Sequence, residues 1–374
     1  MIYLDNAATT MRKPPGVTRA ISDASKSFGG PGRGSHGAAM RAADAVYACR
    51  EAACELFGIK TPESVILTMN ATHSLNIAIK SLAIPGGKVL VSGFEHNAVM
   101  RPLNALEAKG VKHEVVNTPL FDPEKTCTAF ENALDDDVNL VVCTHVSNVF
   151  GYILPIERIA ELCRRKGVTL IIDAAQSAGV LPVNAEHLSG AVLCMPGHKG
   201  LYGPQGTGLL IVPEGVTLTS LTEGGTGSNS LSLDMPQDMP DMLEAGTPNA
   251  WGAAGLYEGI KFVTGTGTEE IAKRERELLS LCAGYLYGIN GVKFWYAPDV
   301  QTGVISMIFD GKDSEDVAAL LNDKGIAVRA GLQCAPTAHD TVGTLPYGTL
   351  RVSFSYFTTP GEIRQFADIL RRIV

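Results

Sequence analysis

Lys199 occupies a loop of glycine and proline residues, 195–208, between two short apolar runs typical of buried strands. A lysine held among such strands loses part of its hydration, which lowers the pKa of its ammonium group and makes the amine usable as a nucleophile or a base. Taken alone, a lysine in a loop is more often a hydrated surface charge. The polar residues at the ends of other predicted strands decide between these interpretations.

Two other polar segments follow predicted strands. Asn70-Ala71-Thr72-His73 precedes a helical pattern, so its backbone N–H groups and hydroxyl favour an anion such as phosphate. Asp173 ends the apolar run 169–172, which places a carboxylate at the end of a buried strand. Either segment alone is also explained as a helix cap. Together, a lysine, a buried carboxylate and a phosphate site fit pyridoxal phosphate, which needs a lysine for its Schiff base, an acid for its ring nitrogen and a cradle for its phosphate.

The elements that must position these residues alternate between strands and helices. A helical pattern at 38–57 precedes the first strand, and others lie between later strands, at 75–82, 97–109 and 156–166. Such alternation, with strands apolar on both faces, predicts an α/β fold whose largely parallel sheet is covered by helices, with ligands bound beyond the carboxyl ends of the strands. The predicted strands cover residues 65–68, 88–92, 112–116, 140–145, 169–173, 191–195 and 209–212.

The pattern changes after residue 220. Residues 223–242 are rich in glycine, methionine and proline and form a segment too long for a simple connection, and such loops are often functional. A long helix is predicted over 268–289. Shorter strands and helices after it indicate a smaller α+β domain, at 303–309, 314–323, 326–329, 349–354 and 360–372.

The composition limits the classes of function. Of 374 residues, 45% are hydrophobic and 19% are charged, which is typical of a compact globular protein. The net charge of -8 argues against nucleic acid as a partner, and no apolar run approaches the roughly 20 residues that cross a bilayer. Since the N-terminal residues also lack the pattern of a signal peptide, we expect a cytoplasmic protein. The eight cysteines show no Cys-x-x-Cys spacing, so we predict neither a disulfide framework nor a metal site.

Further motifs run along nearly the whole chain, in the order Tyr3–Ala8, Arg33–His36, Glu95–Ala98, Thr144–Gly151, Asp173–Gln176, Gly197–Lys199, Glu244–Asn249 and Arg329–Ala335. In this order they resemble the class V aminotransferase superfamily of fold-type I pyridoxal phosphate enzymes, in its cysteine desulfurase and selenocysteine lyase branch. The form Arg-x-Gly-x-x-Cys-Ala at 329–335, followed by Arg351, is similar to the Suf-type (group II) enzymes.

The resemblance implies a fold and an activity. The fold would have a mainly parallel seven-stranded sheet in a large cofactor-binding domain, residues 15–252. Residues 253–374 would form a small C-terminal α+β domain that carries the nucleophilic cysteine. Residues 1–14 would form an arm that contributes to the small domain and to the substrate pocket. The activity would convert L-cysteine to L-alanine and leave a persulfide on Cys334, for transfer to an acceptor protein.

The resemblance also implies roles for single residues around the cofactor. Lys199 would hold pyridoxal 5'-phosphate covalently and move the Cα proton of the substrate, and Asp173 would keep the pyridine nitrogen protonated. Gln176 would bond the phenolic oxygen, and His96 would stack on the ring and take part in catalysis. We expect a homodimer, because the 223–230 loop makes most sense if it reaches the cofactor of another subunit. The phosphate would be bound by Ala71, Thr72, His73, His198 and, from the second subunit, Thr226.

A further group of residues would handle the substrate. Cys334 would be the nucleophile, and a cationic neighbour such as Arg329 or His96 would favour its thiolate. Asn148 and Arg351 would hold the substrate carboxylate, Arg351 by a bidentate pair. The substrate-binding set is completed by Asn6, Ala7 and Ala8, with Arg329.

The chain departs from the family pattern at four positions. Pro196 replaces a serine that contacts the phosphate, His73 replaces a hydroxyl residue of the phosphate turn, and Asn97 and Gln333 replace histidines. The substrate is therefore less well defined than the cofactor, and a selenocysteine lyase or another class V enzyme acting on an amino acid is an alternative. A non-catalytic scaffold on the same fold is a more remote one. A nicotinamide-dependent dehydrogenase is rejected, because no Gly-x-Gly-x-x-Gly follows a first strand.

Overall fold

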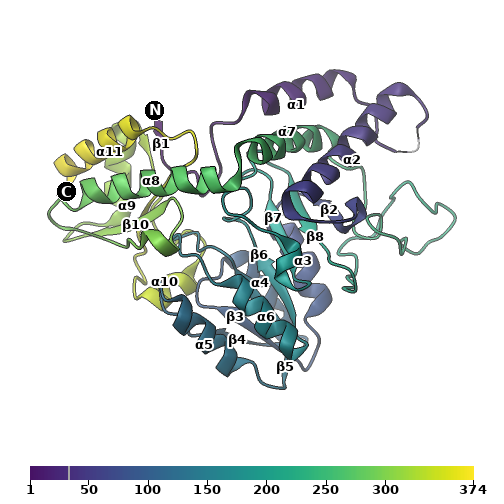
Figure 1. Ribbon diagram of the computed structural model, residues 1–374, viewed down its shortest axis with the longest axis horizontal. Helices are drawn as coiled ribbons and strands as arrows, with labels where there is room; N and C mark the ends of the chain where they lie inside the picture. Colours follow the sequence, from purple (N-terminus) through teal and green to yellow (C-terminus); the bar gives the residue numbers. More distant parts are fainter. Residues whose placement is uncertain (33) are drawn as a thin grey trace.

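A seven-stranded sheet organises most of the chain in the computed structural model, which describes residues 1–32 and 34–374 (Figure 1). Arg33, part of one of the quoted motifs, lies outside the described residues. The strands are β2 (Val65–Thr68), β3 (Lys88–Ser92), β4 (Lys112–Val116), β5 (Val138–Thr144), β6 (Thr169–Asp173), β7 (Val192–Pro196) and β8 (Gly208–Ile211). They lie in the order β2-β8-β7-β6-β5-β3-β4, and the neighbouring pairs from β7 to β4 are parallel.

This sheet confirms the predicted α/β class and its largely parallel strands. Each predicted strand of the sheet is present, with ends that match or are shifted by one or two residues. The direction of β8 differs, because β8 runs antiparallel to both β7 and β2. The loop 197–207 joins β7 to β8 without a crossover helix, and a short direct connection returns the chain antiparallel. The loop that carries Lys199 therefore lies at the carboxyl end of β7.

Two hydrophobic cores cover the two faces of the sheet, because successive side chains of a strand point to opposite faces. In β6, Ile172 belongs to one core and Ile171 to the other. The helices are α2 (Gly37–Phe57), α3 (Ala71–Leu82), α4 (Asn97–Glu107), α5 (Pro123–Ala133), α6 (Ile156–Lys166) and α7 (Ala250–Thr266). Side chains of α2, α5, α6 and α7 complete the core with Ile172, and those of α3 and α4 complete the other.

The C-terminal part forms a second, smaller unit with its own core (Figure 1). Its antiparallel sheet has the order β12-β10-β9, from β9 (Val292–Phe294), β10 (Val304–Phe309) and β12 (Leu350–Ser353). The first strand of the chain, β1 (Ile2–Tyr3), pairs in parallel with β11 (Ile326–Ala327), so the chain begins in this unit. Its helices are α8 (Thr268–Leu286), α9 (Ser314–Asp323) and α11 (Pro360–Ile373), whereas α10 (Pro336–Val342) adds Ala338 to the core that contains Ile172. In the described part of the chain, no helix has the length and apolar character needed to cross a membrane.

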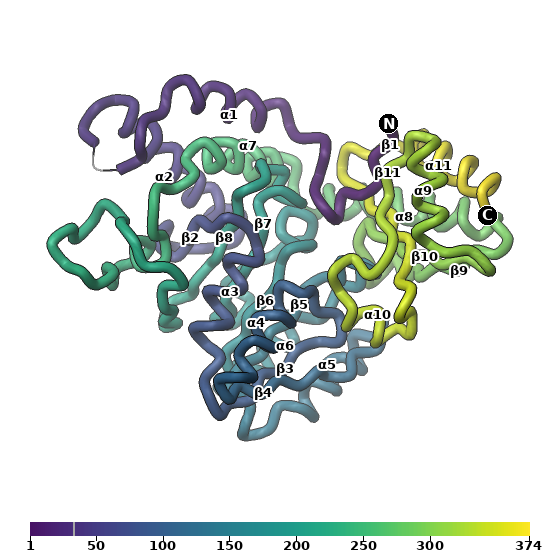
Figure 2. The backbone as a smooth tube through the Cα atoms, turned by 180° about the vertical axis from the view of Figure 1, so that it is seen from behind, coloured from purple at the N-terminus to yellow at the C-terminus, as the bar shows by residue number. Residues whose placement is uncertain are grey.

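The sequence predictions miss four of the described helices, α1 (Pro15–Ser27), α5, α7 and α10, and of these α1 and α7 pack against each other (Figure 2). The glycines of α7 weaken a helical prediction, yet they allow close packing. A Cβ on Gly259 would overlap the carbonyl oxygen of Leu201. The domain limits at residues 14 and 252 stay predictions, and the packing of α7 on α1 and α2 favours a boundary between α7 and α8.

Candidate active site

A cavity of about 220 Å³ lies at the carboxyl ends of β5, β6 and β7, where a parallel sheet binds its ligands. The last residues of these strands, or their neighbours, line it together with the first residues of α3 and α4. Most of the predicted cofactor residues and some of the substrate residues meet here. The predicted residues that line the cavity are Ala8, Ala71, Thr72, His96, Asn148, Asp173, Gln176, His198 and Lys199.

Lys199 follows β7 and Asp173 ends β6, so two adjacent parallel strands deliver these side chains to the cavity. Asp173 is 3% exposed, and its Oδ1 accepts the Ala175 N–H at 2.9 Å. Burial raises the pKa of the Asp173 carboxyl, although this hydrogen bond and the charge of Lys199 oppose the shift. Burial lowers the pKa of Lys199 to about 8, against the opposing attraction of Asp173. The pKa of the lysine therefore lies much closer to neutral pH than its ordinary value, and the buried carboxylate favours a cationic partner.

Two neutral histidines face the same cavity. His96 is the N-cap of α4, and its Nδ1 accepts the Ala98 N–H at 3.0 Å, so the proton of the neutral ring lies on Nε2. Burial, followed by the charge of Lys199, lowers the pKa of His96 to about 4. The same two causes lower the pKa of His198 to about 4, and its Nδ1 is buried without a hydrogen-bond partner among the described residues. A buried nitrogen of this kind is costly unless a ligand supplies the missing partner.

The N-terminus of α3 forms another wall of the cavity. Its N-cap Asn70 accepts the His73 N–H at 2.9 Å, and Ala71 and Thr72 line the cavity. The first-turn N–H groups of a helix and its dipole favour an anion at this position. The His73 side chain lies instead in a neighbouring cavity, which is lined by residues of β2, β8 and 243–249. The structure therefore does not bring His73 together with the other predicted phosphate ligands.

The N-terminal arm is bonded to the loop that follows β7. The His198 carbonyl accepts hydrogen bonds from the Thr10 N–H at 3.2 Å and from Lys13 Nζ at 2.9 Å. Gln176 Nε2 donates to the Ala7 carbonyl at 2.9 Å, which holds the next residue of the arm against the cavity. Thr10 and Lys13 were not among the predicted site residues. Their position just after the Tyr3–Ala8 motif was the available signal.

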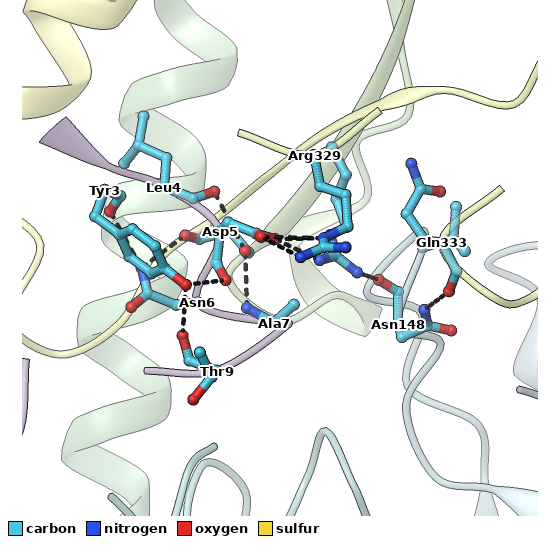
Figure 3. Close-up of polar contacts among 12 residues, drawn as sticks. Tyr3, Leu4, Asp5, Asn6, Ala7, Thr9, Asn148, Arg329 and Gln333 are labelled. Atoms are coloured by element: carbon cyan, nitrogen blue, oxygen red, sulfur yellow. Dashed lines mark hydrogen bonds and ion pairs between the residues drawn. The ribbon is translucent and has the colours of Figure 1, made fainter. Parts of the chain in front are cut away.

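Asp5 joins the two predicted arginines, and Figure 3 shows it beside Arg329. Arg351 Nη2 lies 2.7 Å from Asp5 Oδ1, and Arg329 Nη2 lies 2.9 Å from Asp5 Oδ2. Arg351 Nη1 also donates to the Asn148 carbonyl at 2.8 Å. The Arg351 side chain is 1% exposed, and its Nε has no partner in the part of the chain that the structure describes. Asn148 lines the cavity whereas Arg351 already binds the Asp5 carboxylate, so the role of Arg351 in holding a substrate carboxylate stays a prediction.

Cys334 is exposed on a turn at the edge of the cavity, between the buried residues Gln333 and Ala335. All eight cysteines are in the described part of the chain, and the other seven are buried or half-buried. The Cys334 carbonyl accepts the Asn97 N–H, in the first turn of α4, at 2.8 Å. Asn148 Nδ2 donates to the Gln333 carbonyl at 2.9 Å (Figure 3). Since His96 and Asn148 line the cavity, these two bonds attach the turn to its edge.

Thr226 is not brought to this cavity within one chain. Its Oγ1 lies 2.9 Å from Ser228 Oγ, and it lines a separate cavity with Arg50 and Glu244. The long segment that contains it, between β8 and α7, extends away from the sheet (Figure 2). A contribution of Thr226 to the cofactor site therefore requires a second subunit.

The chain is similar to known proteins along its length. The family model for aminotransferase class-V matches residues 2–366. A probable cysteine desulfurase of Mycolicibacterium paratuberculosis is 31% identical over 100% of this chain, and the chain spans 55% of that relative's length. A probable cysteine desulfurase of Methanothermobacter thermautotrophicus is 30% identical, with 100% of this chain and 94% of that protein covered. The apo structure of a cysteine desulfurase from Thermococcus onnurineus NA1 matches with a TM-score of 0.93 and 30% identity, and covers 100% of this chain and 94% of that one.

Proposed function

Because this chain belongs to the aminotransferase class-V family, we propose that it is a pyridoxal phosphate-dependent cysteine desulfurase with Cys334 as its nucleophile. Proteins named cysteine desulfurases are similar to it over its whole length. The observation that carries the proposal is the cavity in which Lys199 and Asp173 meet, with the Cys334 turn bonded to its edge. A lysine, a buried carboxylate and an exposed thiol are the groups that this reaction needs.

The residues around the cavity fit pyridoxal phosphate. Lys199 would hold the cofactor covalently, since an amine with a pKa of about 8 is a usable nucleophile near neutral pH. The buried carboxylate of Asp173 would pair with the protonated ring nitrogen. The phosphate would be held at the N-terminus of α3, by Thr72 among others, and by His198 Nδ1, which lacks a partner among the described residues. The neutral ring of His96 would lie against the pyridine ring.

Bound pyridoxal phosphate supplies an electron sink for the pair released when the Cα–H bond of the substrate breaks. Lys199 accepts that proton at its amine and can return it, because a pKa of about 8 suits both directions near neutral pH. Asn148 and the arginine pair, 329 and 351, orient the substrate carboxylate. Ala8 lines the cavity, and Asn6 and Ala7 would lie on its substrate side, where the bond from Gln176 to the Ala7 carbonyl holds the arm in place.

Cys334 performs the sulfur transfer. Its thiolate attacks the Sγ atom of the substrate, so that an S–S bond forms while the Cβ–Sγ bond breaks. The electron pair of the broken bond stays with Cβ, which gains a proton. L-cysteine and the Cys334 thiol thus become L-alanine and a Cys334 persulfide, and no external oxidant or reductant is needed. Because Cys334 is exposed, an acceptor protein can take the terminal sulfur there.

The enzyme would act as a homodimer in the cytoplasm. Leu231 and Leu233 are fully exposed in the segment between β8 and α7, and exposed apolar side chains of this kind favour a protein interface. A second subunit would cover them and bring Thr226 to the phosphate of its neighbour. Light scattering together with an activity assay tests this arrangement. A monomer with full activity would contradict it.

The activity is tested with purified protein incubated with pyridoxal phosphate. The absorption spectrum reports the covalent link to Lys199, and assays for alanine and sulfide report turnover of L-cysteine. Wild-type protein should show a band at the edge of the visible range and release alanine. Cys334→Ala should keep the band and lose alanine formation, whereas Lys199→Ala should lose both.

Other results would change the assignment. Alanine from wild type and Cys334→Ala alike, chiefly with L-selenocysteine as substrate, would indicate a selenocysteine lyase. A band without alanine from either amino acid would indicate another class V reaction. No band after addition of pyridoxal phosphate would refute the cofactor site and favour the scaffold.

A further inference from the structure

The turn that carries Cys334 has a backbone conformation that needs support. Gln333 and Cys334 are consecutive residues with positive φ, 42° and 57°, in the left-handed region. This region is unfavourable for residues with a Cβ, so it persists only where surrounding contacts hold it, and such positions cluster at functional sites. The contacts that hold this turn therefore bear on how the thiol is presented.

A chain of buried hydrogen bonds ends at the residue before the nucleophile. Gln333 Nε2 donates to the Thr349 carbonyl at 2.7 Å, and His339 Nε2 lies 3.0 Å from Gln333 Oε1. His339 Nδ1 lies 2.7 Å from Thr344 Oγ1. His339 is 0% exposed and Gln333 is 9% exposed, so these bonds are shielded from water and rigidify the turn.

The donors and acceptors in this series of hydrogen bonds can be assigned in one way. The Thr349 carbonyl only accepts, so the amide nitrogen of Gln333 faces it and the amide oxygen faces His339. That oxygen also only accepts, so the proton of His339 lies on Nε2. Burial lowers the pKa of His339 to about 4, which keeps the ring neutral and leaves Nδ1 to accept the Thr344 hydroxyl. Every polar atom of the two side chains then has a partner of the right kind.

We propose that His339 is a positioning residue for sulfur transfer, which acts through Gln333 to hold the Cys334 turn against the cofactor cavity. The proposal rests on the proposed function, because it takes Cys334 as the nucleophile. Asn97 and Asn148 hold the backbone carbonyls of the turn from the side of the large sheet. The buried hydrogen bonds hold the Gln333 side chain from α10, through His339, and from the segment just before β12, through the Thr349 carbonyl. With only one of these attachments, the turn could relax toward favourable φ values and carry the thiol away from the cavity.

Three variants separate positioning from packing. His339→Leu removes both hydrogen bonds of the ring, whereas His339→Gln retains a donor and an acceptor. Thr341→Val is the matched control, because it removes a bond of the same helix, from Thr341 Oγ1 to the Gly93 carbonyl at 2.8 Å, that does not touch the turn. We expect His339→Leu to lower kcat for L-cysteine by about 100-fold with KM changed less than about 3-fold. We expect a loss within about 5-fold for His339→Gln and within about 2-fold for Thr341→Val.

Alkylation of Cys334 by iodoacetamide gives a second readout that does not require turnover. Mass spectrometry of the peptide with Cys334 yields the alkylation rate as a function of pH, which we expect to change in His339→Leu and to match wild type in Thr341→Val. If wild-type protein makes no alanine from L-cysteine, the proposed function fails, while the alkylation rates still decide whether His339 positions the thiol.

Wild-type kcat and an unchanged alkylation profile in His339→Leu would overturn the proposal. Equal losses in His339→Leu, His339→Gln and Thr341→Val would also overturn it, because they would indicate a general loosening of the helix. If His339→Leu does not fold, Thr344→Val takes its place, since it removes only the hydroxyl that donates to His339. Its kcat should fall by about 5-fold, and a kcat equal to that of Thr341→Val would count against the proposal.

Discussion

Replacing Asp5 by asparagine should destabilise the protein by about 3 kcal/mol, because the change leaves a buried arginine without its counter-charge. The Asp5 carboxylate is shared by Arg351 and Arg329, at 2.7 Å and 2.9 Å. The Arg351 side chain is 1% exposed and that of Arg329 is 49% exposed. Removing one partner of a buried pair costs about 3–5 kcal/mol, whereas an exposed pair contributes about 0–1 kcal/mol. The lower end applies, since the asparagine oxygen can still accept from Arg351.

Urea unfolding followed by circular dichroism measures this difference, with the slope against urea compared to confirm that the unfolded states are alike. Arg329→Met is the control, and it should cost less than about 1 kcal/mol because water solvates its site. Combining Asp5→Leu with Arg351→Met should restore much of the stability, because neither buried charge remains. The reasoning from burial would be refuted if the unfolding free energy of Asp5→Asn lay within about 0.5 kcal/mol of wild type. An equal loss of stability in Arg329→Met would refute it as well.

Three further predictions follow from buried or crowded positions. Burial raises the pKa of Glu275 to about 8 from 4.5, so the folded protein holds a proton there that the unfolded chain releases, and stability should fall as pH rises between these values. Glu275→Gln should reduce the slope of the unfolding free energy against pH by up to about 1.4 kcal/mol per pH unit. Urea unfolding at several pH values between 4.5 and 8 measures this slope, and an unchanged slope would exclude Glu275 as its source. Gly179 has a φ of 81°, and a Cβ there would overlap the Gly200 carbonyl, so Gly179→Ala should lower the free energy of unfolding by at least about 3 kcal/mol. The control Gly190→Ala has a similar φ of 80° but open space around the new Cβ, so it should cost only about 1 kcal/mol. Similar losses of stability in both variants would contradict the predicted clash. Pro196 lines the cavity without a hydroxyl, so Pro196→Ser should tighten pyridoxal phosphate binding by about 5-fold in a fluorescence titration, and unchanged or weaker binding would argue against a phosphate contact there.

The sheet was predictable because most of its strands are apolar runs between polar turns, although the edge strand β4 is largely polar. The bounds of 169–173 and of the helix 314–323 match the structure for this reason. The direction of β8 was not predictable from periodicity, since an apolar run has the same pattern in a parallel or an antiparallel strand. Helix α7 was missed because its glycines lower the helical propensity. In the structure these glycines allow the helix to pack closely against the loop after Lys199.

The candidate site was predictable where motifs supplied the residues, and less so where distant segments meet. Lys199, Asp173, His96 and Thr72 line one cavity as expected, because each lies in or beside the end of a strand or helix at the same end of the sheet. The His73 side chain was expected there too, yet the geometry of the α3 cap turns it toward the neighbouring cavity. The contribution of a second subunit through the 223–230 loop stays a prediction.

The sequence by itself determined the class of the sheet and the identities of the reactive groups. Both depend on local properties, namely the period of apolar residues and the chemistry of single side chains. Only the tertiary structure decided which groups are partners and which are charged. Asp5 meets Arg351 across 346 residues of chain, and burial lowers the pKa of His339 and His96 to about 4. Desolvation and hydrogen-bond pairing depend on what surrounds an atom in space, and that environment is assembled from segments far apart in the chain.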